Sequence, residues 1–92
     1  MLTVFDLQAE GTHNSYHVAI EGGVPLYAYS HAPIIAQLGA QGVRQFELDI
    51  NDIDGVFQVF HAPFIDDQTT CLLLADCLSQ FRQFTDANPG HH

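Results

Sequence analysis

The chain has 92 residues, 47% of them hydrophobic, and a formal net charge of -9 at pH 7. That length allows one small domain with a modest core, and the apolar content is too high for a disordered chain. Only Arg44 and Arg82 carry fixed positive charge against eleven acidic side chains, which argues against nucleic acid as a partner and against recruitment to anionic membranes by a basic patch.

The first expected elements are a strand end and a long irregular segment. Residues 11–16 read as the end of a strand that opens into a loop, where Gly11 allows an unusual backbone turn. Residues 17–29 are expected to be irregular, because they are punctuated by Gly22, Gly23 and Pro25.

A short helix and an alternating strand are expected next. Ser30 is expected to cap the helix and Gly42 to end it. The apolar face of this helix comprises Ile34, Ile35 and Leu38. Residues 43–50 alternate between apolar and polar side chains, which predicts a strand. One face of that strand carries Phe46, Leu48 and Ile50, and the other carries Gln45, Glu47 and Asp49.

The second half predicts a turn, a short strand and a longer helix. Asp54 and Gly55 form the turn, and residues 56–60 form a strand that ends at His61. Residues 73–84 predict a helix with three apolar side chains at helical spacing: Leu74, Leu78 and Phe81. The order strand, helix, strand, strand, helix suits an α/β fold better than a hairpin-rich one.

Two acidic residues of the predicted strand are candidate metal ligands. Glu47 and Asp49 lie two positions apart, so both side chains point to the same face. Their carboxylates repel each other unless a cation or a shared proton lies between them. A hard divalent cation with oxygen ligands, Ca²⁺ or Mg²⁺, satisfies that geometry. The alternative is an ordinary solvated strand face.

Two histidines are candidate catalytic residues. His13 lies in a polar loop, and His61 ends an aromatic strand. Two such histidines at a phosphate can act as general base and general acid, each contributing about 10²–10⁴ in rate. The other histidines are interpreted as ordinary loop residues: His17, His31, His91 and His92. Tyr16, Tyr27 and Tyr29 either line a sugar pocket or belong to the core.

Two roles are open for Arg44, and two states are open for the pair of cysteines. Arg44 either contacts a substrate phosphate or has a packing or ion-pair role. Cys71 and Cys77 lie six positions apart; inside one helix their Cα atoms would be about 9 Å apart, beyond the roughly 7 Å that a disulfide allows. Either Cys71 lies in the loop before the helix and bridges back to Cys77, or both are free. A bridge indicates a secreted protein.

Four segments, taken together and in this order, carry a family resemblance. They are GTHNSYH (11–17), QGVRQFELDI (41–50), VFHAPFID (59–66) and TTCLLLADCL (69–78). The chain from about Leu7 to His92 resembles the N-terminal part of calcium-dependent phosphatidylinositol-specific phospholipases C of bacterial type. The resemblance implies a TIM-type (β/α) barrel. It also implies cleavage of phosphatidylinositol, in which the inositol 2-hydroxyl attacks phosphorus and gives diacylglycerol and a cyclic inositol phosphate.

The resemblance also implies roles for individual residues. His13 and His61 match the family's catalytic histidines, and Asn14, Glu47 and Asp49 match its first metal ligands. The calcium-independent relatives place an arginine at the position of Asp49, so an aspartate implies that Ca²⁺ does the work of that cation. The implied partner is phosphatidylinositol or a related phosphodiester lipid, met by transient contact with a membrane surface, and the implied location is secreted or extracellular.

The departure from the family is length, because about 250 residues are typical of the barrel. We therefore expect residues 1–92 to be a partial domain, the N-terminal portion of a barrel too short to close, from a fragment or a truncated gene product. No signal peptide is visible in residues 1–10. One rival is a glycerophosphodiester phosphodiesterase, whose first motif is typically His-Arg-Gly rather than the His13-Asn14-Ser15 of this chain. Another is a non-catalytic calcium-binding or oligomerising fragment.

Overall fold

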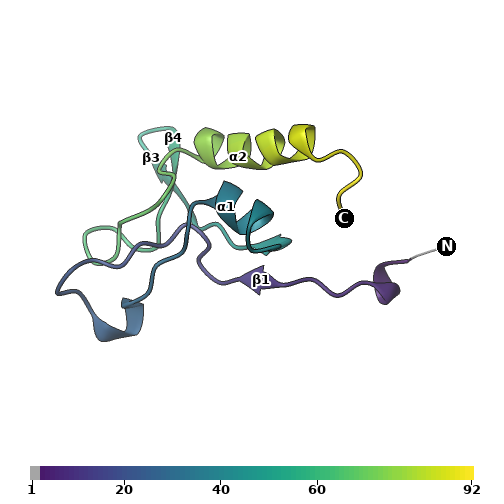
Figure 1. Ribbon diagram of the computed structural model, residues 1–92. Helices are drawn as coiled ribbons and strands as arrows, with labels where there is room; N and C mark the ends of the chain where they lie inside the picture. Colours follow the sequence, from purple (N-terminus) through teal and green to yellow (C-terminus); the bar gives the residue numbers. More distant parts are fainter. Residues whose placement is uncertain (1–2) are drawn as a thin grey trace.

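The computed structural model describes residues 3–92, in which short strands combine with two α-helices (Figure 1). In chain order the elements are a 3₁₀ turn η1 (Val4–Asp6), β1 (Gly11–Thr12), a 3₁₀ turn η2 (Pro25–Tyr27), α1 (Ile34–Gly39), β2 (Gln45–Phe46), β3 (Ile50–Ile53), β4 (Val56–Val59) and α2 (Leu74–Ala87). The protein is thus a small mixed α/β domain, and the predicted fold class is confirmed at that level. None of the helices in residues 3–92 is long and apolar enough to cross a membrane.

The first sheet is a parallel pair of two-residue strands. Gly11 of β1 lies opposite Gln45 of β2, and Thr12 lies opposite Phe46. The connection between the two strands contains α1, so the unit is strand, helix, parallel strand. Since the strands run in the same direction, the residues that follow them emerge at the same end of the sheet. That end carries the polar residues singled out above.

The second sheet corrects the prediction of one continuous strand over 43–50. The β2 strand stops after Phe46, and Ile50 begins β3, which pairs antiparallel with β4 in a hairpin. The side chain of Ile50 is 52% exposed rather than buried. The interruption has a tertiary cause, because Ser15, from the loop after β1, takes the place of a strand partner. Its N–H donates to the Glu47 carbonyl at 3.0 Å, and its Oγ accepts from the Glu47 N–H at 2.9 Å.

The turn and cap residues of the hairpin and of α1 differ in how well they were predicted. Asp54 and Gly55 form the hairpin turn as predicted, both with positive φ. The prediction that Ser30 caps α1 is wrong: the residue before the helix is Pro33, and the Ser30 Oγ accepts from the N–H of Ala19 at 2.9 Å. The helix ends at Gly39, before Gly42 reverses the chain with a φ of 69°.

The second helix runs three residues beyond its predicted end, to Ala87, where the Asn88 N–H bonds back to the Phe84 carbonyl at 3.0 Å. Its buried residues are Cys77 and Phe84, while Leu78 is 52% exposed and does not belong to the buried face as predicted. Cys71 precedes the helix and is bonded to Cys77 in a disulfide with a Cα–Cα distance of 5.4 Å. Of the two alternatives for the cysteines, the structure therefore shows the bridged one.

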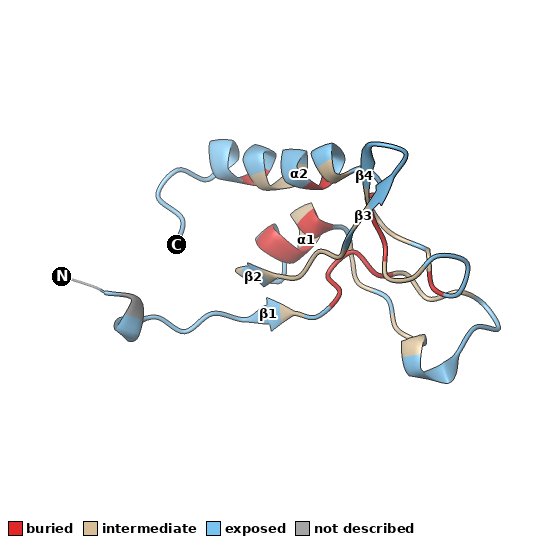
Figure 2. Cartoon of the chain, turned by 180° about the vertical axis from the view of Figure 1, so that it is seen from behind, coloured by how far each residue is buried: buried red, intermediate tan, exposed pale blue. Residues whose placement is uncertain are grey.

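The core lies between α1, α2 and the loop that follows β1, as the buried segments in Figure 2 show. Its buried members are Tyr16, Ile34, Leu38, Val59, Cys71, Cys77 and Phe84. Helices α1 and α2 lie side by side in both views, and the Ile35 N–H of α1 donates to the Gln80 side chain of α2 at 2.9 Å. The core anchors the loop after β1, and that loop presents the candidate functional residues.

Candidate functional site

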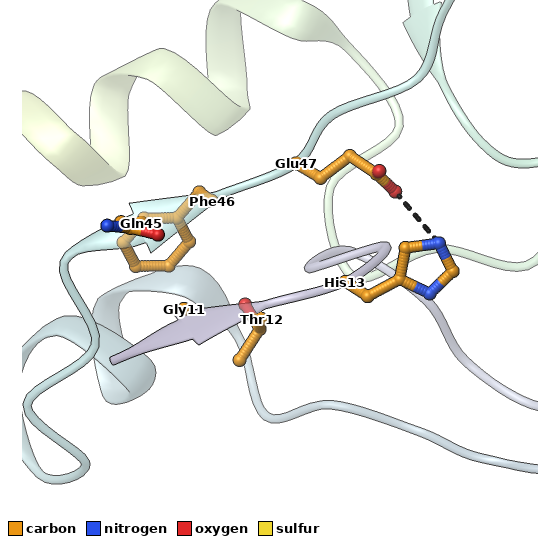
Figure 3. Close-up of a pocket in the computed structure, with 6 residues that line it drawn as sticks. All are labelled: Gly11, Thr12, His13, Gln45, Phe46 and Glu47. Atoms are coloured by element: carbon orange, nitrogen blue, oxygen red, sulfur yellow. Dashed lines mark ion pairs between the residues drawn. The ribbon is translucent and has the colours of Figure 1, made fainter. Parts of the chain in front are cut away.

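His13 and Glu47 meet at the carboxyl ends of β1 and β2. The Nε2 atom of His13 lies 3.5 Å from Oε2 of Glu47, and Figure 3 shows the two side chains pointing toward one another. The His13 side chain is 76% exposed. Both residues border a hollow of about 470 Å³ that is also lined by Gly11, Thr12, Gln45 and Phe46. The parallel register therefore brings one predicted catalytic residue next to one predicted metal ligand.

The side chains of Asn14, Glu47 and Asp49 form a carboxylate–amide cluster. The backbone N–H of Asn14 donates to Glu47 Oε2 at 2.9 Å, and Asn14 is 2% exposed with a left-handed φ of 49°. The hydroxyl of Tyr16 donates to Asp49 Oδ2 at 2.7 Å. The three predicted metal ligands thus converge, although Glu47 and Asp49 lie just beyond the short β2 strand rather than within a long one.

The Asn14 amide can take either of two orientations in this cluster. In one, Nδ2 donates to the Tyr29 hydroxyl at 2.7 Å, and Oδ1 faces the carboxylates. In the other, Oδ1 accepts from the Tyr29 hydroxyl at 2.7 Å, and the nitrogen donates to Asp49 Oδ2 at 3.2 Å and to Glu47 Oε2. The second orientation gives both the oxygen and the nitrogen of the amide suitable partners without a cation. The first places three oxygen acceptors together, and a cation is then needed to offset their repulsion.

The donor set of the cluster has the chemistry that a hard cation requires. Two carboxylates and an amide are all-oxygen ligands of the kind that bind Ca²⁺. The cluster contains two acidic side chains, and no group of three or more His, Cys, Asp or Glu side chains poised for a metal occurs in residues 3–92. Only in the first orientation of its amide does Asn14 offer its oxygen as a third protein ligand beside the two carboxylates.

His61 belongs to a second group, formed with Asp66 and His17. Asp66 lies between the two histidines: its Oδ2 is 2.9 Å from His61 Nδ1, and both its oxygens are 2.7 Å from His17 Nε2. Asp66 is 1% exposed and His17 is fully buried. The interpretation of His17 as an ordinary loop residue is therefore wrong. We refer to His61, Asp66 and His17 as the histidine–aspartate group.

Tyr29 connects the two groups. Its ring stacks on His17 with centroids 4.3 Å apart, and its carbonyl lies 2.7 Å from His17 Nδ1. Its hydroxyl bonds to the Asn14 amide at 2.7 Å. Tyr27 packs its ring edge-on against His61 at 4.8 Å. These two tyrosines thus support site residues rather than the core.

Tyr16 is fully buried and belongs to the core. Burial, and then the hydrogen bond to Asp49 with the negative charges of Asp49 and Glu47, raise the pKa of the Tyr16 phenol well above its usual value. The phenol therefore remains a protonated donor to Asp49 at ordinary pH. Of the two roles weighed for the tyrosines, Tyr16 takes the core one.

Arg44 lies apart from both groups. Its guanidinium donates to the carbonyls of Leu38 and Val43, at 2.7 and 2.9 Å, and to the carbonyl of His92 at 2.7 Å. It also sits over the ring of Phe84, 4.9 Å from the centroid. Of the two roles predicted for Arg44, packing is the one that the structure shows.

The structure thus brings His13 together with Asn14, Glu47 and Asp49, places His61 in the adjoining histidine–aspartate group, and leaves Arg44 outside. Comparisons of this chain with protein-family models, with curated proteins and with solved structures find no match. Sequence reasoning missed Asp66 and His17. The available signal was the Pro63 after His61, which indicates a chain reversal that can return Asp66 to the histidine.

Proposed function

We propose that this chain carries part of a calcium-assisted phosphodiesterase site that cleaves phosphatidylinositol into diacylglycerol and a cyclic inositol phosphate. The observation that supports the proposal most directly is the convergence of Asn14, Glu47 and Asp49 beside His13 at the carboxyl ends of two parallel strands. In parallel α/β folds this end of the sheet is where ligands bind. The order of the motifs in the sequence supports the same assignment.

Asn14 Oδ1 and the carboxylates of Glu47 and Asp49 would hold the calcium ion. When bound, Ca²⁺ supplies positive charge that stabilises the charge developing on the phosphate oxygens. The protein prepares these ligands in two ways. The Tyr16 hydroxyl orients Asp49, and the backbone N–H of Asn14 orients Glu47. Both contacts leave other lone pairs of the carboxylates free to bind the cation.

His13 and His61 move the protons in the proposed reaction. One histidine takes the proton of the inositol 2-hydroxyl as that oxygen bonds to phosphorus, and the other gives a proton to the glycerol oxygen as its bond to phosphorus breaks. The exposed ring of His13 is accessible to a substrate headgroup, and the side chain of His61 is 26% exposed. The net change is one P–O bond formed and one broken, with the proton count conserved.

We further propose that residues 1–92 are the N-terminal portion of a TIM-type barrel domain that is too short to close. Parallel sheets are normally larger and covered on both faces, whereas the β1–β2 pair is two-stranded. Apolar side chains of the β3–β4 hairpin are also exposed: Val56 is 47% and Phe57 is 55% exposed. The coding sequence downstream of His92 tests this part of the proposal. Further strand–helix units with an acidic strand end support it, and a stop codon followed by unrelated sequence contradicts the fragment interpretation.

Calcium titration of the 92-residue chain by calorimetry tests the metal site. We expect binding in the range of about 10⁻⁴–10⁻³ M, as for modest oxygen-ligand sites. Glu47→Gln and Asp49→Asn should each abolish the signal. Glu10→Gln, the same substitution at an exposed residue whose side chain has no assigned role, should retain it. An absence of calcium binding by the parent chain would contradict the proposed function.

Product analysis then separates the proposed activity from its rivals. Phosphatidylinositol in mixed micelles with Ca²⁺ should give cyclic inositol phosphate once the complete domain is assayed, and chelation of Ca²⁺ should stop the reaction. Cleavage of glycerophosphodiesters with phosphatidylinositol left intact would favour the glycerophosphodiesterase alternative. Calcium binding without hydrolysis of either substrate by the complete domain would favour a non-catalytic calcium-binding module.

A further inference from the structure

We propose that Asp66 is the positioning residue of His61, and that His17 in turn fixes Asp66. The arrangement holds His61 as the tautomer that carries its proton on Nδ1, so that Nε2 is the nitrogen presented to a substrate. The catalytic meaning of Nε2 depends on the proposed function. The tautomer itself does not, because it follows from the hydrogen bonds of the histidine–aspartate group.

The proton on His17 is determined by its buried partners. Its Nδ1 lies 2.7 Å from the carbonyl of Tyr29, and a carbonyl can only accept, so Nδ1 carries a hydrogen. Its Nε2 lies 2.7 Å from both oxygens of Asp66, close enough that a hydrogen must lie between the two groups. A hydrogen therefore bridges His17 and Asp66, and both ring nitrogens of His17 have buried hydrogen-bond partners. This arrangement accounts for the complete burial of both groups.

Asp66 also determines the orientation of the His61 ring. Its Oδ2 accepts from His61 Nδ1 at 2.9 Å, and the ring of Tyr27 packs edge-on against His61. Because Nδ1 is engaged in this bond, Nε2 is the ring nitrogen that remains free to accept or deliver a proton. Both contacts restrict rotation of the imidazole. A general acid or base must be held in a fixed orientation for catalysis.

A narrow loop brings Asp66 back to His61. The N–H of Ala62 donates to the Asp66 carbonyl at 2.8 Å, and the N–H of Asp66 donates to the Ala62 carbonyl at 3.0 Å. The reversal places Phe64 at a φ of 64°, a conformation that is rare for an aromatic residue, while its side chain is 96% exposed. Packing of Phe64 therefore does not explain the strained backbone. The strained residue instead belongs to the loop that brings Asp66 into contact with His61.

Histidine-selective ¹⁵N NMR of the labelled 92-residue chain tests the proposal directly. The His61 signals are assigned by their loss in His61→Gln. In the parent chain we expect neutral His61 to be protonated mainly at Nδ1, the reverse of the preference of free imidazole side chains in water. A His61 that is protonated mainly at Nε2 would overturn the proposal, and this outcome requires no variant that might unfold.

Two matched variants then show whether Asp66 is the cause. In Asp66→Asn the side-chain amide can donate as well as accept, so the ratio of the two His61 tautomers should shift by about tenfold, as expected for loss of a charge-assisted hydrogen bond. Asp67→Asn, the same change one residue further on, should leave the ratio unchanged. Equal ratios in both variants would show that another contact sets the tautomer.

The measurement uses neither calcium nor lipid, so its outcome is independent of the calcium titration. A chain that binds no Ca²⁺ but holds His61 as the Nδ1–H tautomer contradicts the proposed function and supports the role of Asp66. A chain that binds Ca²⁺ but has His61 protonated at Nε2 supports the proposed calcium site and contradicts the role of Asp66.

Discussion

The hydroxyl of Tyr16 donates to Oδ2 of Asp49 across 2.7 Å, so a core residue fixes one of the proposed calcium ligands. The phenol is fully buried, and its burial together with the neighbouring carboxylates raises its pKa. The same side chain consequently affects stability, the orientation of Asp49 and the response of the protein to alkaline pH.

Tyr16→Phe is expected to lower the free energy of unfolding by about 1 kcal/mol, because it removes one buried hydrogen bond and leaves Asp49 with one donor fewer. Urea unfolding at pH 7 measures the change. Tyr27→Phe removes the hydroxyl of a residue that contacts its neighbours through the ring, and it should leave the unfolding free energy within about 0.5 kcal/mol of the parent. Equal losses in the two variants would contradict the role assigned to the Tyr16 hydroxyl.

Alkaline pH should destabilise the parent chain through Tyr16. The folded pKa of this phenol is raised above its usual value of 10.0, so its contribution to stability is fully present below pH 10 and is lost as the pH rises above that value. Unfolding monitored between pH 8 and pH 11.5 should show a steeper loss of stability in the parent than in Tyr16→Phe. Parallel curves would indicate that other groups dominate the alkaline transition.

Arg44→Lys is expected to lower stability by about 1–2 kcal/mol, because a single ammonium group cannot replace Nη1 at the carbonyls of Leu38 and Val43 and Nε at the carbonyl of His92 at once. Arg82→Lys is the matched control. Arg82 pairs with Asp86 on the exposed face of α2, where an ion pair contributes little, so that change should be nearly neutral. Calcium affinity should be the same in both variants. A selective loss of calcium binding in Arg44→Lys would place Arg44 at the site after all.

Reduction of the disulfide between Cys71 and Cys77 should lower stability by about 2 kcal/mol, the chain-entropy value for a short closed loop. Unfolding with and without dithiothreitol measures the effect. The double variant Cys71→Ser/Cys77→Ser should show the reduced stability and no further response to the reductant. A response of the double variant would indicate that the reductant acts elsewhere.

Phe64→Gly is expected to keep or raise stability, by up to about 1 kcal/mol. Glycine relieves a left-handed conformation that costs about 1–2 kcal/mol in other residues, and this gain exceeds the entropy that glycine loses on folding. Little packing is lost, since the side chain is 96% exposed. Ile65→Gly, a neighbouring change without positive φ, should lower stability by about 0.5–1 kcal/mol. Thermal unfolding distinguishes the two, and a clear loss in Phe64→Gly would contradict the account of strain.

Local sequence patterns predicted the secondary-structure elements of this fold better than the long-range contacts that these elements make. Glu47 and Asp49 both lie against the Asn14 side chain, as one face of the alternation over 43–50 predicted, although not within a continuous strand. Asp54 and Gly55 correctly indicated a turn. The continuous strand failed because Ser15, distant in sequence, supplies both hydrogen bonds to the backbone of Glu47. A periodic pattern contains no information about such a contact.

The sequence predicted most residues of the candidate site, but it did not predict the residues that position them. His13, Asn14, Glu47 and Asp49 do converge, because strand ends in a parallel pair share one end of the sheet. His17 was misread, since a histidine in a polar run gives no sign that Asp66 will be folded against it from 49 positions away. Whether such a pair is buried depends on tertiary packing, which the secondary-structure propensities of the residues do not predict.

Tyr29 gives the two halves of the site separate points of attachment. It serves His17 through its backbone carbonyl and Asn14 through its phenolic oxygen. Removal of the hydroxyl alone, as in Tyr29→Phe, can therefore alter the asparagine while the ring and the carbonyl that contact His17 stay in place. The proposed calcium ligand Asn14 and the histidine–aspartate group can in this way be adjusted independently, by mutation or by evolution, even though Tyr29 touches both.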